Sequence, residues 1–149
     1  MNRELILKIS LPLLTFLIGG LGALSNIYTD WTWYDSLNKS SLNPPDHLFG
    51  IVWPILYTLM AVVSFLHAKL IYKLYIPQLV LNGAWPWIFF VYQQPDIAFI
   101  NIVVLIGLNL VILMKLKGQG AWLSFALYLP YLLWICFAAF LNISIAILN

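Results

Sequence analysis

Five long apolar stretches, separated by short polar segments, make up most of this sequence and limit what it can fold into. A helix needs about 20 mostly apolar residues to cross a hydrocarbon layer about 30 Å thick. Only 8% of the residues are charged, whereas a soluble domain carries roughly 25%. We therefore predict an all-α membrane protein, a bundle of five transmembrane helices that forms a single domain. The predicted spans are residues 5–27, 47–68, 76–94, 96–114 and 120–147 of the 1–149 chain.

Basic residues gather on one side of these spans. Six of the seven lie before or at the start of the first span or in the second and fourth connections: Arg3, Lys8, Lys69, Lys73, Lys115 and Lys117. Cytoplasmic loops are enriched in lysine and arginine, so we predict a cytoplasmic N-terminus and a C-terminus outside. The apolar run from Ile9 to Ile27 is longer than that of a cleavable signal peptide, and we expect it to be retained.

The first connection, residues 28–46, is the longest polar segment of the chain. It carries Trp31, Trp33 and Tyr34, amphipathic rings of the kind that lie at a membrane interface. Long loops in an otherwise tightly connected chain are often functional. Pro44 and Pro45 end this segment just before the second span.

The spans offer little acid-base or metal chemistry. No charged residue lies in the middle of any span, which argues against ion-coupled transport. His47 and His67 lie near opposite ends of one span, about 30 Å apart, so they cannot share a metal. The single cysteine, Cys136, excludes an intramolecular disulfide. We predict no metal site and no nucleic-acid partner, and we assign no catalytic residue.

Aromatic and amide side chains instead recur at helical spacing on three spans. Residues three, four or seven apart share a helix face, and this relates Trp53 with Tyr57, Asn82 with Trp85 and Phe89, and Trp134 with Ala138 and Asn142. An unsatisfied amide is costly in hydrocarbon, so both asparagines should face the interior. Contact between helices and contact with a ligand explain the asparagines equally well. Together the three stripes predict an aromatic pocket for a planar apolar ligand.

These motifs resemble those of the translocator protein family, also called tryptophan-rich sensory proteins or peripheral benzodiazepine receptors. The matching residues keep their order over nearly the whole chain: Trp33-Tyr34, Pro44-Pro45, Trp53, Tyr57, Asn82, Trp85-Pro86, Phe89, Pro130-Tyr131, Trp134, Ala138 and Asn142. The resemblance implies a five-helix bundle, commonly a homodimer, whose pocket is capped by residues 28–46. The expected ligand contacts are Ala23, Trp33, Trp53, Tyr57, Asn82, Trp85, Phe89, Trp134, Ala138 and Asn142.

The function that the resemblance implies is a membrane receptor or sensor for porphyrin-like tetrapyrroles, with a role in tetrapyrrole regulation or stress response. The expected ligand is protoporphyrin IX or a haem-like molecule, and no cofactor is required. Two alternatives stay open: light- and oxygen-dependent porphyrin breakdown, and transport of porphyrins or lipids. Ser40 and Ile97 depart from the family pattern, and no aromatic-plus-basic segment follows Asn142. We therefore expect a bacterial plasma-membrane member rather than a sterol transporter.

Overall fold

A computed structural model describes residues 2–149 as helices joined by short turns, with no strand in that range. The elements are α1 (Arg3–Tyr28), α2 (Trp31–Ser36), α3 (Asp46–Leu66), α4 (Ala68–Pro86), the π-helical turn η1 (Trp87–Val91), α5 (Pro95–Gly118) and α6 (Trp122–Leu148). Counting α4 and η1 as one, 5 of them are long and apolar enough to cross a membrane. The predicted fold class is confirmed.

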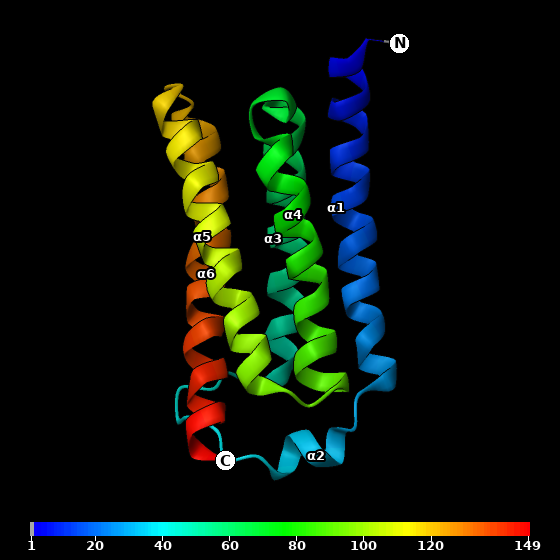
Figure 1. The fold of residues 1–149 in the computed structure, drawn as a ribbon, viewed down its shortest axis with the longest axis vertical. Helices are drawn as coiled ribbons and strands as arrows, with labels where there is room; N and C mark the ends of the chain where they lie inside the picture. The colour runs from blue at the N-terminus through cyan, green and yellow to red at the C-terminus, as the bar shows by residue number, and fades with distance from the viewer. Residues whose placement is uncertain (1) are drawn as a thin grey trace.

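The long helices run side by side, and short α2 lies across one end of the bundle (Figure 1). Helix α1 packs on α3 and α4, whereas α5 packs on α4 and α6, and α6 also contacts α3. The chain termini lie at opposite ends (Figure 1). The basic residues that the sequence places on one side belong to the end that carries the N-terminus; which end faces the cytoplasm remains a prediction.

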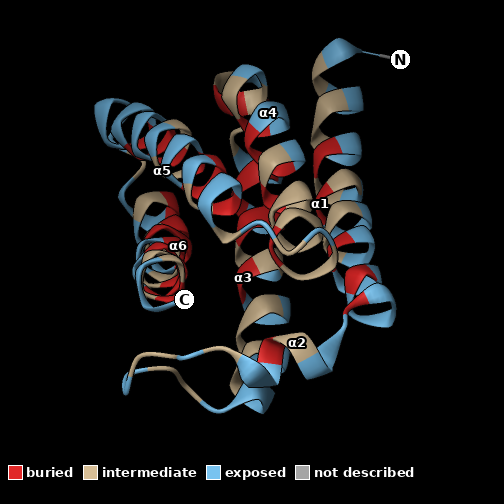
Figure 2. Ribbon diagram, turned by 60° about the horizontal axis from the view of Figure 1, so that its bottom comes forward, coloured by how far each residue is buried: buried red, intermediate tan, exposed pale blue. Residues whose placement is uncertain are grey.

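Buried residues face the middle of the bundle, and exposed ones face outward (Figure 2). The centre is filled by side chains that are fully buried, among them Met60, Ile71, Tyr75, Tyr128 and Tyr131. The outer surface is also apolar, as expected for a surface in contact with lipid, and includes Leu13, Leu17, Ile51, Met114 and Leu133.

The third predicted span begins earlier than the sequence analysis placed it. A single residue, His67, separates α3 from α4, so Lys69 and Lys73 lie in the first turns of α4 rather than in a loop. These lysines lower the apolar content of the segment without breaking the helix, because their long stems let the ammonium groups reach the polar surface. The first connection likewise contains a helix, α2, whose N-cap Asp30 accepts from the backbone of Thr32 at 3.0 Å.

The π-helical turn η1 follows Pro86 directly. Wider backbone hydrogen bonds replace the regular pattern, with Tyr92 N donating to Trp87 O at 2.9 Å and Gln94 N donating to Ile88 O at 3.1 Å. Such turns often occur at functional sites because they redirect side chains out of the regular helical order. Here the turn carries Phe89 and Phe90, and both side chains line a cavity in the bundle.

Candidate ligand-binding cavity

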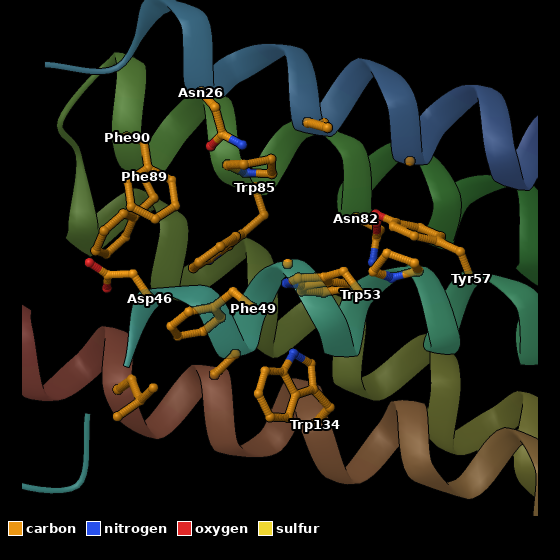
Figure 3. A pocket seen from close by; sticks show the side chains of 18 of the residues that line it. Asn26, Asp46, Phe49, Trp53, Tyr57, Asn82, Trp85, Phe89, Phe90 and Trp134 are labelled. Atoms are coloured by element: carbon orange, nitrogen blue, oxygen red, sulfur yellow. Dashed lines mark hydrogen bonds between the residues drawn. The ribbon is translucent and has the colours of Figure 1, made fainter. Parts of the chain in front are cut away.

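A cavity of about 730 Å³ lies in the half of the bundle next to α2. Its wall is formed by side chains of α1, α2, α3, α4, η1 and α6. Figure 3 shows wall residues of α1, α3, α4, η1 and α6. Every contact predicted from the sequence except Trp33 lines this cavity: Ala23, Trp53, Tyr57, Asn82, Trp85, Phe89, Trp134, Ala138 and Asn142. Side chains from four separate helices therefore converge on one space.

Three indole rings from α3, α4 and α6 form the wall. Trp53 stacks on Tyr57 with ring centroids 5.6 Å apart, one helical turn along α3. Trp85 stacks on Phe89 at 5.3 Å, and Trp134 meets Phe49 edge to face at 5.8 Å. Because each indole is held by a neighbouring ring, the wall offers flat apolar surfaces in fixed orientations.

The two asparagines join helices while they line the cavity. Asn82 Oδ1 accepts from the Tyr57 hydroxyl at 2.6 Å, and Asn82 Nδ2 donates to the Tyr131 hydroxyl at 2.8 Å. Asn142 Oδ1 accepts from Trp85 Nε1 at 2.9 Å, and Asn142 Nδ2 donates to Pro95 O at 2.7 Å. Both amides use their donor and acceptor within the protein. Contact between helices was one of the two explanations that the sequence allowed for these asparagines. The structure shows such contacts for both Asn82 and Asn142.

One polar group of the indole wall has no partner. The Trp134 Nε1 atom is buried and makes no hydrogen bond among residues 2–149, unlike Trp85 Nε1. A buried donor left unpaired costs free energy, and a ligand acceptor placed against it recovers that cost. The cavity wall thus combines extensive aromatic surface with a buried N–H donor that has no partner.

Trp33 is not among the residues that line the cavity, and its role as a ligand contact stays a prediction. It packs behind the wall, with its ring centroid 6.1 Å from that of Phe89. Trp31 and Tyr34 line the cavity instead. They are three residues apart and share one face of α2, while Trp33 points elsewhere. The Asp30 cap was the sequence signal for this short helix.

The segment between α2 and α3 is fastened to the end of α6. Asn149 Oδ1 accepts from Asn38 N at 2.9 Å, and Asn149 Nδ2 donates to Asn38 O at 3.1 Å. Next to it, Lys39 Nζ lies 4.1 Å from the centre of the Tyr34 ring. Burial raises the pKa of the Tyr34 phenol, so this lining hydroxyl stays neutral. These contacts hold α2 over the cavity end.

A chain of buried polar groups below the cavity was missed by the sequence analysis. From Asn82 it continues through Tyr131, whose hydroxyl donates to Gln78 Oε1 at 2.9 Å. Asn109 Nδ2 also donates to Gln78 Oε1, at 3.4 Å, and Tyr128 donates to Asn109 Oδ1 at 2.6 Å. Gln78 and Asn109 were apparent in the sequence as amides within spans, but their mutual contact depends on how the helices pack.

Among residues 2–149 no group of three or more His, Cys, Asp or Glu residues is placed to hold a metal ion. Asp46 and His47 lie at the mouth of the cavity, where both are exposed. What the wall offers a bound molecule is therefore aromatic surface and hydrogen-bond donors.

Five helices long enough to span a membrane, four of which line an aromatic cavity, define a class, the polytopic integral membrane proteins. Residues 9–148 match the TspO/MBR family. The tryptophan-rich protein TspO of Archaeoglobus fulgidus is 35% identical, over 97% of this chain and 98% of its own. Protein CrtK of Rhodobacter capsulatus is 34% identical over 86% and 85%, and the human translocator protein 34% over 74% and 70%. The chain belongs to the TspO/MBR family.

Proposed function

We propose that this protein binds a flat, largely apolar molecule of the porphyrin class within the membrane and acts as its receptor or sensor. The observation that carries the proposal is that Trp53, Trp85 and Trp134, from three different helices, line one cavity. Membership of a family whose members are named tryptophan-rich proteins and translocator proteins supports it.

The size and chemistry of the cavity fit such a ligand. Its volume of about 730 Å³ falls in the usual range of small-molecule sites, about 300–1,000 Å³. Stacked pairs such as Trp53 with Tyr57 present flat faces to a planar ring system. The unpaired Trp134 Nε1 donor favours a ligand with a carbonyl or carboxylate oxygen at its edge.

The test is a titration of the reconstituted protein with protoporphyrin IX. Affinity is followed by the absorbance of the ligand, so that replacing a tryptophan does not remove the signal. We expect Trp53→Leu and Trp134→Leu each to weaken binding about tenfold or more, because aromatic contacts dominate such sites. The matched control is Trp122→Leu, whose ring is 60% exposed at the other end of α6. Unchanged affinity in both cavity variants would refute the proposal.

The same titration, repeated under illumination, separates binding from porphyrin breakdown. A receptor gives saturable binding without a lasting new pigment beyond that of a protein-free control. A pigment that accumulates over many turnovers would instead indicate an enzyme. Movement of labelled porphyrin across proteoliposomes would indicate a transporter. Location in a bacterial plasma membrane and assembly as a homodimer remain predictions alongside this one.

A further inference from the structure

The residues that line the cavity differ in exposure according to the helix that carries them. Those contributed by α2, α4, η1 and α6 include buried ones, such as Tyr34, Asn82, Phe89 and Asn142. Those contributed by α1 and α3 are mostly exposed. The exposed part of the wall marks where the cavity opens.

On each of the two helices the exposed lining residues form a stripe. On α1 they are Phe16, Gly20, Ala23 and Asn26, and on α3 they are Asp46, Gly50, Pro54 and Thr58, with His47 exposed beside Asp46. Spacings of three and four residues place each set on one helix face. Since α1 and α3 are packed together, the two stripes border a single opening between them, which we call the α1–α3 opening.

The α1–α3 opening is too long to face only the aqueous end of the bundle. Asp46 and Thr58 are separated by twelve residues, about 18 Å along a helix at 1.5 Å per residue. The apolar layer of a bilayer is about 30 Å thick, so the opening extends past the middle of the layer. Acyl chains therefore border most of its length.

Open space lies beside two glycines of these stripes, Gly20 and Gly50. A Cβ atom added at Gly20 or Gly50 would meet nothing within 4 Å. By contrast, α1 touches its neighbours closely at other points, where a Cβ on Gly19 would lie 3.0 Å from the Tyr57 ring and one on Gly83 2.8 Å from Ile18. Helix α1 is thus in close contact with α3 and α4 along one face, whereas the face that carries Gly20 borders open space.

The deep part of the opening is apolar, and its shallow end beside α2 carries Asn26, Asp46 and His47. The only hydroxyl in its deep part, Thr58 Oγ1, donates to Pro54 O at 2.8 Å and is satisfied within its own helix. At the other end, Trp31 and Tyr34 of α2 lie over the cavity, and the Asn38–Asn149 hydrogen bonds fasten the following segment. An apolar molecule thus meets less obstruction from the side than from the end.

We propose that the α1–α3 opening is a lateral portal through which the ligand reaches the cavity from the lipid, and that a lipid acyl chain occupies it when no ligand is bound. The proposal rests on the cavity being a ligand site, as proposed above. It identifies the ligand class further as molecules that dissolve in the bilayer before they bind.

The first experiment needs no ligand and therefore tests the portal separately from the proposed function. In a Cys136→Ala background, a nitroxide spin label is attached to Gly20→Cys in lipid nanodiscs. Its collision rates with oxygen and with a water-soluble nickel chelate are compared with two references. Gly107→Cys is the lipid reference, because this exposed α5 glycine also has nothing within 4 Å of its Cβ. Leu42→Cys, 63% exposed in the connection before α3, is the aqueous reference.

A portal filled by acyl chains gives Gly20→Cys the oxygen preference of the Gly107→Cys reference. A nickel preference like that of Leu42→Cys would mean that the opening is a water-filled vestibule, and this would overturn the proposal. A label shielded from both reagents would mean that the opening is closed, and this would also overturn the proposal.

The second experiment uses protoporphyrin IX as the probe. Gly50→Cys, again in the Cys136→Ala background, is modified with a bulky methanethiosulfonate reagent, and Gly107→Cys is the control. An obstructed portal slows association and dissociation together, each by about tenfold. Reduction of the mixed disulfide restores both rates. Unchanged rates, or a change in dissociation alone, would overturn the portal; absence of binding in the unmodified protein would instead refute the proposed function.

Discussion

The two halves of this bundle differ in packing although the same helices build both. Next to α2, the rings of Trp53, Trp85 and Trp134 surround open space. In the half toward the His67 turn, side chains such as Ile71 and Tyr128 are fully buried and fill the interior. Hydrogen-bonding groups are present in both halves. The difference shows that rings in contact with neighbouring rings can line open space, whereas fully buried side chains that reach the bundle centre, such as Tyr75 and Tyr131, fill it.

The largest effect is expected from truncating the packed half. Ile71→Ala removes a side chain that is 0% exposed, and the resulting cavity should lower the free energy of unfolding by about 2–5 kcal/mol. Ile51→Ala, on the lipid-facing side of α3 at 56% exposure, is the matched control and should change it by less than about 0.5 kcal/mol. Reversible unfolding in mixed micelles measures both. Equal losses would mean that the two halves are packed alike.

The next effect concerns ligand affinity in the hollow half. Trp134→Phe keeps an aromatic ring but removes the unpaired Nε1 donor. We expect affinity for protoporphyrin IX to fall by about 0.5–1.5 kcal/mol, the value of one hydrogen bond. Unfolding should be unaffected, because the N–H makes no bond within residues 2–149. Trp122→Phe serves as control. A destabilised Trp134→Phe protein with normal affinity would show that the indole N–H serves the fold instead.

A smaller effect is expected at the boundary between the halves. Tyr57→Phe removes the hydroxyl that donates to Asn82 Oδ1 at 2.6 Å. Hydrogen bonds between membrane helices contribute about 0.6 kcal/mol on average, so the loss in unfolding free energy should be of that size. Tyr92→Phe, at a ring 68% exposed, is the control. A loss several times larger would mean that the polar chain through Tyr131 acts as one cooperative unit across both halves.

The smallest effect is a pH dependence at the far end of the packed half. Desolvation lowers the pKa of His67, whose Nε2 lies 2.9 Å from Ser124 Oγ. The folded state therefore binds the proton less well than the unfolded chain, so stability is full above the ordinary histidine pKa of about 6.5 and falls as pH drops below it. Thermal unfolding between pH 8 and pH 5.5 measures this. The His67→Gln variant should show a weaker dependence of stability on pH. An unchanged dependence would mean that other groups cause it.

Much of the architecture was predictable because each transmembrane helix is a local structure. Apolar length alone identifies a span, since a helix satisfies its backbone hydrogen bonds within one segment. Errors occurred where local composition misled. Lys69 and Lys73 hid the beginning of α4, and the polar residues around Asp30 hid α2. In both places the backbone is helical although the sequence is not apolar.

The cavity was predictable in its residue types and less so in its membership. Helical spacing correctly grouped Trp53 with Tyr57 and Trp134 with Ala138, because residues four apart share a face in any helix. The same rule requires the helix to be known, and so Trp33 was named as a contact while Trp31 and Tyr34, which line the cavity, were not. Whether the cavity residues bind a ligand stays a prediction.

By itself, the sequence determined that this chain forms membrane-spanning helices and which face of each carries aromatic rings, since both follow from the composition and spacing of neighbouring residues. Only the tertiary structure decided that Asn82 and Asn142 join helices, that Trp134 Nε1 has no partner, and that Gly20 and Gly50 line the cavity beside open space. These features arise where residues far apart in the chain meet. Lipid imposes no hydrophobic preference on which helix faces pair, so close packing and hydrogen bonding between helices decide them.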